Sequence, residues 1–351
     1  MVQKILKGYK KKVWKELDSY LKSPTYPKAF DIPQDYSSVK GFHWQLCRDY
    51  PERKGKYLRP VLLLLTAEAM GANFRNAIKT AAAMQISEDW LLIHDDLEDK
   101  SLERRGQPTL HRIYGAELAI NAGDTLQTVM WKIIFDNRKI LGNKKTEKIA
   151  DEFYKILSRT ELGQTTEIKW TKDNKLNFSD KDWFFICDGK TSCYTIAGPM
   201  RLGAIIAGST DSQLEILAEF GIYLGRCFQL VDDILDVTSN FKGLKKQKGN
   251  DIYEGKRTII LGHLLRTARK EDKRKIAQII SKAREEKSQK EVDWIISKMN
   301  EYESIKYARK IAEKYSDKAK KIFSKELRFL SKQPVRKNLL ELIDFILERE
   351  Y

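Results

Sequence analysis

Two short acidic clusters have the residue types and spacing best suited to chemistry in this sequence. The first, HDDLED at residues 94–99, follows an apolar run at residues 81–93, and the second, DDILD at residues 232–236, interrupts another apolar stretch. Residues three and four apart share one face of a helix, so each cluster would gather its carboxylates. Like charges on an apolar helix are costly unless a cation compensates them. Hard oxygen ligands of this kind suit Mg²⁺, which also keeps water and phosphate ligands.

A solvated acidic helix end is the alternative interpretation of these clusters. For one D-D-x-x-D motif alone, that alternative is as good as a metal site. Two copies, each flanked by apolar residues, favour metal binding. Glu98 is expected to be a bystander whose side chain points elsewhere.

Four glycine-flanked basic motifs indicate that a bound Mg²⁺ would meet an anionic substrate. RRGQPTLH at residues 104–111 follows the first acidic cluster, and GKYLRP at residues 55–60 precedes an apolar helix. GKT at residues 189–191 opens another helix, and GKRT at residues 255–258 follows the second cluster. The N-terminus of a helix favours an anion. One basic pair alone is most often a surface feature, whereas four beside two acidic clusters indicate a binding site.

The elements that must position these residues are predicted to be helices. Seven of the eight prolines lie before residue 109 or after residue 333, which leaves only Pro199 between. Proline costs about 3 kcal/mol inside a helix, so long proline-free stretches permit successive helices. Apolar residues recur at spacings of three and four, and no alternating strands with Asn-Gly or Asp-Gly turns occur. We therefore expect one large all-α domain over residues 1–351. Its expected helices span residues 2–21, 60–70, 76–100, 115–140, 145–170, 180–187, 190–207, 211–238, 256–270, 273–284, 290–299, 304–331 and 336–349.

Charge and composition limit the class of protein. The 351 residues include 65 Lys and Arg against 49 Asp and Glu, a net charge of +16, and residues 241–351 hold 30 of these cations against 17 acids, a net charge of +13. A binder of nucleic acid or of an anionic membrane surface is one interpretation of that basic region. However, Glu and Lys interleave at residues 282–290 as on a solvated helix face, and no nucleic-acid motif occurs. We expect no nucleic-acid partner.

Localisation is predicted from apolar runs and cysteines. The apolar run at residues 61–67 is far too short to span a bilayer, and the basic start of the chain lacks the apolar core of a signal peptide. Four cysteines are too few for a disulfide scaffold. We expect a cytoplasmic protein without stable membrane insertion.

Taken in order from residue 55 to residue 258, these motifs resemble those of the trans-isoprenyl diphosphate synthases, the polyprenyl synthetase family. The resemblance rests on both aspartate-rich motifs, G-K-x-x-R-P, R-R-G-x-P-T-x-H, K-T and F-Q-x-x-D-D. The pattern is most similar to archaeal short-chain geranylgeranyl and farnesyl diphosphate synthases. It implies a single large helical bundle of the isoprenoid synthase type around a central cavity, usually as a homodimer. It also implies a prenyltransferase that condenses an allylic diphosphate with isopentenyl diphosphate and releases pyrophosphate.

The resemblance also implies a role for each motif residue. Three Mg²⁺ ions would be held against the allylic diphosphate by Asp95, Asp96, Asp99, Asp232, Asp233 and Asp236. The same diphosphate would contact Arg104, Lys190 and Lys256. Isopentenyl diphosphate would be held by Lys56, Arg59 and Arg105, with Thr191 and Gln229 nearby. The residues expected to carry the chemistry are Asp95, Asp96, Asp99, Lys190, Asp232 and Lys256. Gln164 and Glu167 resemble a family G-Q-x-x-D motif in which Glu replaces Asp.

Two departures from the family pattern concern charge. Glu88 stands seven residues before Asp95, where relatives usually have His or Gln in contact with isopentenyl diphosphate. A carboxylate there would repel the diphosphate unless it pairs with a cation such as Lys56 or Arg59. Asn250 replaces the lysine of the common G-K-D motif, which is a milder change.

Product length is predicted from the helix that leads to Asp95. The growing chain would run back along this helix, so Trp90, Ser87 and Ala83 are candidate tunnel walls. Ordinary core packing is the alternative role of Trp90. As a floor, Trp90 favours a short product, and the resemblance to archaeal enzymes favours C20 geranylgeranyl diphosphate, with C15 as the alternative.

Two other enzyme-like interpretations remain beside this one. A non-catalytic subunit of a heteromeric synthase would normally carry a damaged aspartate motif, and both motifs are intact here. A class I terpene cyclase shares the helical architecture and one D-D-x-x-D motif, but its second metal motif differs from the repeat at residues 232–236.

Overall fold

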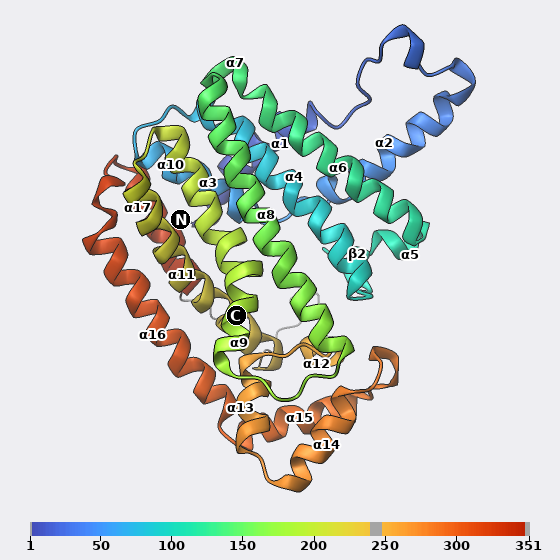
Figure 1. The fold of residues 1–351 in the computed structure, drawn as a ribbon, viewed down its shortest axis with the longest axis vertical. Coiled ribbons are helices and arrows are strands. Elements are labelled where there is room, and N and C mark those ends of the chain that lie inside the picture. The colour runs from blue at the N-terminus through green and yellow to red at the C-terminus, as the bar shows by residue number, and fades with distance from the viewer. Residues whose placement is uncertain (1, 239–247, 348–351) are drawn as a thin grey trace. The chain divides into compact units, whose positions relative to one another are not determined.

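The computed structural model describes residues 2–238 and 248–347, and helices make up almost all of its regular structure (Figure 1). The strands in this part of the chain are β1 (Glu103–Arg104) and β2 (Gln107–Pro108), which pair antiparallel with Glu103 opposite Pro108. The predicted all-α class is confirmed.

Contacts along the backbone divide the chain into two compact units. The first unit comprises residues 1–151, 202–209 and 331–338, and the second comprises residues 152–201, 210–330 and 339–351. Three long or medium helices, α8 (Asn143–Lys172), α10 (Gly198–Ala207) and α17 (Val335–Leu347), contribute residues to both. That residues 1–351 form one domain stays a prediction.

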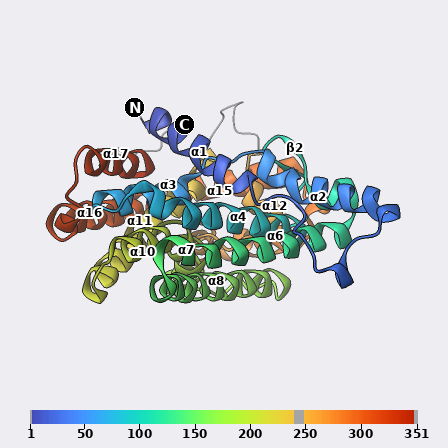
Figure 2. The same ribbon diagram turned by 90° about the horizontal axis from the view of Figure 1, so that it is seen from above.

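The first unit is built around α4 (Phe74–Glu98). Helices α1 (Val2–Asp18), α2 (Ser37–Glu52), α3 (Leu58–Ala69), α5 (Leu110–Tyr114) and α6 (Ala116–Asp136) all contact it, and α6 runs beside it (Figure 2). Residues 80–87 of α4 are buried on every side, as expected of a helix covered all round. At its start the Asn73 side chain accepts a hydrogen bond from the Arg75 N–H at 2.8 Å, which satisfies one of the open donors of the first turn. Three short helical elements complete this unit: η1 (Lys28–Phe30), η2 (Gln34–Tyr36) and α7 (Arg138–Leu141).

The second unit is built in the same way around α11 (Asp211–Thr238). Its neighbours are α9 (Asp180–Cys187), the π-helix η3 (Asp188–Ala197), α12 (Asn250–Glu254), α13 (Ile259–Thr267) and α16 (Ser304–Lys325). The unit also contains α14 (Lys270–Ile280), η4 (Arg284–Glu286), α15 (Gln289–Glu301) and η5 (Leu327–Phe329). Each unit thus places at its centre the helix that carries one acidic cluster near its C-terminal end.

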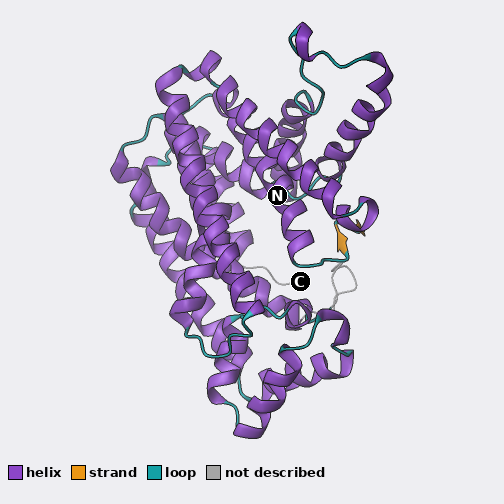
Figure 3. Cartoon of the chain, turned by 45° about the vertical axis from the view of Figure 1, so that its right-hand side comes forward, coloured by secondary structure: helices purple, strands orange, loops and turns teal. Residues whose placement is uncertain are grey.

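Figure 3 shows helices joined by loops and turns. Their boundaries differ from the predicted ones in two informative places. No helix was expected at residues 37–52. The structure starts α2 after Pro33 and tolerates Pro51 in its last turn. The single helix expected at residues 190–207 is instead the π-helix η3 followed by α10. The expected helix at residues 336–349 extends past residue 347, outside the described residues.

Candidate active site

The first acidic cluster lies at the C-terminal end of α4. Asp99 caps the helix, with its backbone N–H bonded to the Asp95 carbonyl oxygen at 2.8 Å. Asp95 and Asp99 are half-buried, whereas Asp96 is fully buried. The two adjacent aspartates therefore occupy different environments.

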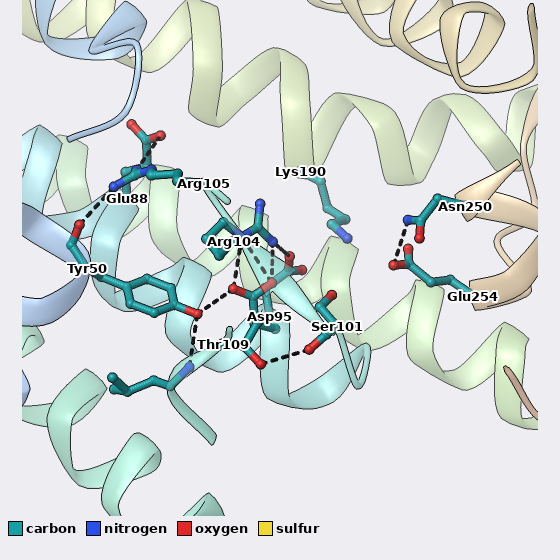
Figure 4. Close-up of polar contacts among 12 residues, drawn as sticks. Tyr50, Glu88, Asp95, Ser101, Arg104, Arg105, Thr109, Lys190, Asn250 and Glu254 are labelled. Carbon is teal, nitrogen blue, oxygen red and sulfur yellow. Dashed lines mark hydrogen bonds and ion pairs between the residues drawn. The ribbon is translucent and has the colours of Figure 1, made fainter. Parts of the chain in front are cut away.

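Asp96 is held by two protein donors, Tyr50 and Arg104, which are both labelled in Figure 4. The Tyr50 hydroxyl donates to Asp96 Oδ2 at 2.6 Å, and Arg104 donates from Nε to the same oxygen at 2.9 Å and from Nη2 to Oδ1. Burial by itself lowers the pKa of the Arg104 guanidinium. The hydrogen bond to Asp96 and the negative charge of Asp96 raise it by more, so the pKa of Arg104 lies above its ordinary value. Both oxygens of Asp96 accept hydrogen bonds from the protein. That Asp96 binds a metal ion stays a prediction. Arg104 Nη2 also lies 3.7 Å from Asp95 Oδ2, so one cation serves both aspartates.

Arg105 stands beside the start of α3, where Lys56 and Arg59 were predicted to bind the same diphosphate. The Arg105 backbone is left-handed, with φ of 56°, in the turn between β1 and β2. Its guanidinium donates from Nη1 to the Tyr50 carbonyl oxygen at 2.9 Å. A Cβ on Gly55 would come within 2.7 Å of Arg105 Nη2, so glycine permits this approach. The structure thus brings Arg105 to the G-K-x-x-R-P motif within one unit.

Two carboxylates of α4 face these cations. Glu88 Oε2 lies 3.2 Å from Arg59 Nη1, and Glu88 Oε1 lies 3.7 Å from Arg105 Nη2. Asp89 Oδ1 accepts from Arg105 Nη1 at 3.2 Å. Burial, opposed by Arg105, raises the pKa of the Asp89 carboxyl to about 7. The condition placed on Glu88, pairing with a nearby cation, is met by Arg59.

A lysine from α1 reaches the loop that carries Lys56. Lys10 Nζ donates to the carbonyl oxygens of Gly55 at 2.9 Å and of Lys54 at 3.2 Å. Burial, together with the charge of Arg105, lowers the pKa of Lys10. Lys10 thus fastens the backbone next to Lys56, whose side chain is exposed.

The candidate tunnel residues lie about one to three helical turns before the first acidic cluster. Ala83, Ser87 and Trp90 are all buried in α4. The Trp90 ring meets the His94 ring edge-on, with centroids 5.7 Å apart. His94 in turn packs on α6 at Gly123, where a Cβ would overlap its ring. His94 is therefore a packed residue at the end of α4.

The second acidic cluster lies near the C-terminal end of α11. Asp232 is exposed and Asp236 is half-buried, while Asp233 is buried. Asp233 Oδ1 accepts from Gln229 Nε2 at 2.8 Å, but its buried Oδ2 accepts no hydrogen bond. Burial raises the pKa of Asp233 well above its usual range, and the carboxylates of Asp251, Asp232 and Asp236 raise it further. This carboxylate is poorly compensated by the protein alone.

Lys190 and Thr191 lie on the π-helix η3, in the same unit as this second cluster. Thr191 Oγ1 donates to Gln229 Oε1 at 2.6 Å, so the K-T motif is tied to α11 next to Asp233. Lys190 Nζ donates to Glu167 Oε2, which joins the G-Q-x-x-E run of α8 to the same place. Gln164 also lies on α8, one turn before Glu167, and is half-buried.

Glycines allow η3 to pack closely against its neighbours. A Cβ on Gly225 of α11 would overlap the Cα of Ser192, and a Cβ on Gly189 would lie 2.7 Å from the Arg159 carbonyl oxygen. π-Helical turns are rare and occur frequently at functional sites. Here the π-helix sets the positions of Lys190, the predicted contact of the allylic diphosphate, and Thr191, predicted to lie near isopentenyl diphosphate.

Lys256 lies between α12 and α13 and is paired with an acid. Its Nζ is 2.6 Å from Glu254 Oε2, and Arg284 Nη1 is 3.3 Å from Glu254 Oε1. Asn250 completes this group, because its amide donates to Glu254 Oε1 at 2.8 Å (Figure 4). The Asn250 amide oxygen also accepts from Arg284 Nη2 at 2.8 Å. The neutral residue at position 250 therefore bridges two charged side chains.

With this geometry in view, comparison with known proteins assigns the family. The family model described as polyprenyl synthetase matches residues 43–299, which is more than half of the chain. The chain belongs to the polyprenyl synthetase family. It is therefore a trans-prenyltransferase, and both the predicted resemblance and the predicted class of enzyme are confirmed.

Relatives of this polyprenyl synthetase include archaeal enzymes. It is 31% identical over 299 residues to the geranylgeranyl diphosphate synthase of Methanosarcina mazei, which covers 85% of this chain and 86% of that protein. It is 33% identical over 265 residues to the geranylgeranyl diphosphate synthase of Saccharolobus solfataricus, with 76% and 78% covered. The crystal structure of geranylgeranyl pyrophosphate synthetase from Pyrococcus horikoshii superposes with a TM-score of 0.83, 28% identity and 99% of both chains covered.

The family acts on isopentenyl and allylic diphosphates and uses a divalent metal ion. The donor chemistry of this polyprenyl synthetase suits such an ion, because the predicted ligands are carboxylates and the buried Asp233 Oδ2 has no hydrogen-bond partner. Among the described residues, no group of three or more His, Cys, Asp or Glu side chains converges closely enough to hold a metal ion. In the part of the chain that the structure describes, no helix is both long and apolar enough to cross a bilayer.

Sequence reasoning missed several residues that position the predicted site of this polyprenyl synthetase. Tyr50 and Lys10 gave no signal, since they lie in segments without a recognised motif. Asp89 could have been noticed as an acid inside an apolar run. Glu254 could have been noticed for its position two residues before Lys256.

Proposed function

We propose that this polyprenyl synthetase condenses isopentenyl diphosphate with an allylic diphosphate in a Mg²⁺-dependent reaction that yields trans-geranylgeranyl diphosphate. One observation carries the proposal. In each unit, the central helix bears an acidic cluster, and basic or polar residues of the recognised motifs lie in the same unit. In the first unit, Arg104 lies against Asp95 and Asp96. In the second unit, Lys190 and Thr191 lie on the helix that Gln229 ties to Asp233.

The allylic diphosphate is assigned to the two acidic clusters. Asp95, Asp99, Asp232, Asp233 and Asp236 are the proposed Mg²⁺ ligands, with Asp96 a further candidate, and three ions are proposed. When bound, Mg²⁺ would stabilise the negative charge that develops on the departing pyrophosphate. Arg104, Lys190 and Lys256 would add fixed positive charge to the same leaving group. The protein's remaining task is to hold the two substrates in the geometry for reaction.

Isopentenyl diphosphate is assigned to Lys56, Arg59 and Arg105. Arg105 is fixed by the Tyr50 carbonyl oxygen and Asp89, and Arg59 faces Glu88. The double bond of this substrate would attack the allylic carbon, and the proton lost would pass to the departing pyrophosphate. No side chain is assigned as the base.

Product length and assembly are part of the proposal. Supporting a C20 product, Trp90 is buried in α4 one turn before Asp95, and similar archaeal proteins are named geranylgeranyl diphosphate synthases.

A homodimer is supported by exposed apolar side chains of Ile113 on α5 and of Leu118, Ile120 and Phe135 on α6. A cytoplasmic location is supported by the free thiols of Cys47, Cys187, Cys193 and Cys227, which a reducing compartment preserves.

The test is a condensation assay with isopentenyl diphosphate and each of dimethylallyl, geranyl and farnesyl diphosphate. We expect prenyl transfer with at least one primer, loss of the reaction after treatment with EDTA, and recovery on addition of Mg²⁺. Folded protein that transfers no prenyl group to any primer would contradict the proposal. Activity that survives complete removal of divalent ions would contradict its metal dependence.

A further inference from the structure

We propose that Glu88 is a specificity-determining residue that competes with isopentenyl diphosphate for Arg59 and Arg105. Its carboxylate would occupy these cations before substrate binds and would thereby raise the KM for isopentenyl diphosphate. This inference rests on the proposed function.

Glu88 is held loosely for a carboxylate with so little contact with solvent. Its side chain is 13% exposed, and it lies 3.2 Å from Arg59 and 3.7 Å from Arg105. Its buried Oε2 accepts no hydrogen bond. A buried charge without good hydrogen bonds is poorly compensated, so Glu88 can be displaced by an incoming anion at the cost of its two ion pairs.

Asp89 provides the contrast on the same helix. It is buried, with 1% of its side chain exposed, and Oδ1 accepts from Arg105 at 3.2 Å while Oδ2 accepts from Gln85 Nε2 at 3.3 Å. A ligand arriving from solvent does not reach this carboxylate. Asp89 is therefore the fixed partner of Arg105, and Glu88 is the exchangeable one.

Arg105 is held in place, so Glu88 rather than the Arg105 guanidinium is expected to move when a diphosphate binds. The Tyr50 carbonyl oxygen accepts from Arg105 at 2.9 Å, and the backbone of Gly55 closes one side of the guanidinium. With Arg105 fixed in this way, the flexible Glu88 side chain is the group that moves when a diphosphate binds. Binding therefore includes the cost of breaking two ion pairs and leaving Glu88 with less compensation.

The variant Glu88→Gln removes the negative charge and keeps the size of the side chain. We expect the KM for isopentenyl diphosphate to fall about 5- to 10-fold, the size of a single charge interaction close to a protein surface. We expect kcat and the KM for the allylic diphosphate to stay within about 2-fold. The dissociation constant of isopentenyl diphosphate, measured calorimetrically without an allylic partner, should fall with its KM.

The matched control is Glu16→Gln on α1. Glu16 Oε1 is paired with Lys79 Nζ at 2.6 Å, and its side chain is 25% exposed, so the change removes a comparable half-buried carboxylate from the same unit. Its KM for isopentenyl diphosphate should match that of the unmodified protein. A second variant, Glu88→Ala, should lower the same KM if it folds, which separates charge from any new amide contact.

A higher or unchanged KM for isopentenyl diphosphate in both Glu88 variants would overturn the inference. A higher value would show that Glu88 positions Arg59 instead of competing for it. Failure of the proposed function would give a different result. Neither the unmodified protein nor the Glu88 variants would then condense isopentenyl diphosphate with any allylic primer.

Discussion

Arg104 forms a bidentate ion pair with Asp96 and reaches Asp95 with the same guanidinium, Nη2 lying 3.7 Å from Asp95 Oδ2. Asp96 is fully buried and also accepts from the Tyr50 hydroxyl at 2.6 Å. The two neighbouring aspartates of this motif therefore differ in environment, because Asp96 is buried and pairs with Arg104 while Asp95 is half-buried.

Substitution of these two aspartates should separate activity from stability. Asp96→Asn removes the buried carboxylate that pairs with the half-buried Arg104 and should lower the free energy of unfolding by about 3 kcal/mol. Asp95→Asn should change stability by less than about 0.5 kcal/mol and lower kcat at least about 100-fold, the loss typical of a group that stabilises charge in the transition state. Urea unfolding and the condensation assay measure the two effects. Equal stability losses would contradict the division of roles.

The raised pKa of Asp89 predicts a pH dependence of stability. Burial raises the pKa of this carboxyl from 3.8 to about 7. A carboxyl whose pKa is higher in the folded state contributes most below its unfolded pKa, and the contribution is lost as pH rises through the folded value. A shift of this size corresponds to up to about 4 kcal/mol.

The measurement is the free energy of unfolding of the unmodified protein minus that of Asp89→Asn, taken between pH 4 and pH 8. The variant has no titrating group at this position, so other carboxyls cancel in the difference. The difference should fall steadily as pH rises toward 7. A difference independent of pH would show that Asp89 stays ionised over the whole range.

Close packing of η3 against α11 gives a prediction for Gly225. A Cβ there would overlap the Cα of Ser192, so Gly225→Ala must displace the segment that carries Lys190 and Thr191. We expect a stability loss of about 1–3 kcal/mol and a fall in kcat of at least about 10-fold, because small displacements of ligand-binding groups are costly.

Gly8 is the control for this substitution. It lies on the exposed face of α1 with nothing within 4 Å of an added Cβ. Gly8→Ala should raise stability by about 0.5–1 kcal/mol and leave kcat unchanged. Gly225→Ala behaving like Gly8→Ala in thermal unfolding and in kcat would refute the packing argument.

Trp90 predicts the length of the product. It is 4% exposed, lies five residues before Asp95 and packs on His94. Trp90→Ala should lengthen the prenyl product, whereas Trp90→Phe, which retains a ring, should leave it nearly unchanged. Chromatography of the dephosphorylated products measures the length, with circular dichroism to confirm folding. A folded Trp90→Ala variant with the original product would assign Trp90 to ordinary packing.

The parts of the site that sequence could reveal are those with a regular spacing. Both acidic clusters lie on helices close to their predicted bounds, because apolar periodicity and the absence of proline define α4 and α11 without any tertiary information. The pairing of Glu88 with Arg59 was also foreseeable, since a buried carboxylate needs a cation.

Other features depend on contacts between distant segments. Tyr50 reaches Asp96 from α2, a helix not expected near Pro51. The π-helix η3 depends on how Gly225 and Gly189 let neighbouring backbones approach, which the K-T motif itself does not encode. Lys10 donates to backbone carbonyl oxygens. Every residue has such a carbonyl group, so the sequence does not reveal which lysine makes this contact. Local pattern therefore located the ligands, and tertiary packing determined what holds them.

The most direct test of the account is the product formed from isopentenyl diphosphate and dimethylallyl diphosphate with Mg²⁺, identified by mass spectrometry. We predict geranylgeranyl diphosphate, a C20 product, together with pyrophosphate in proportion to the bonds formed. Absence of any prenyl diphosphate longer than the primer, from folded protein with metal present, would contradict the central claim.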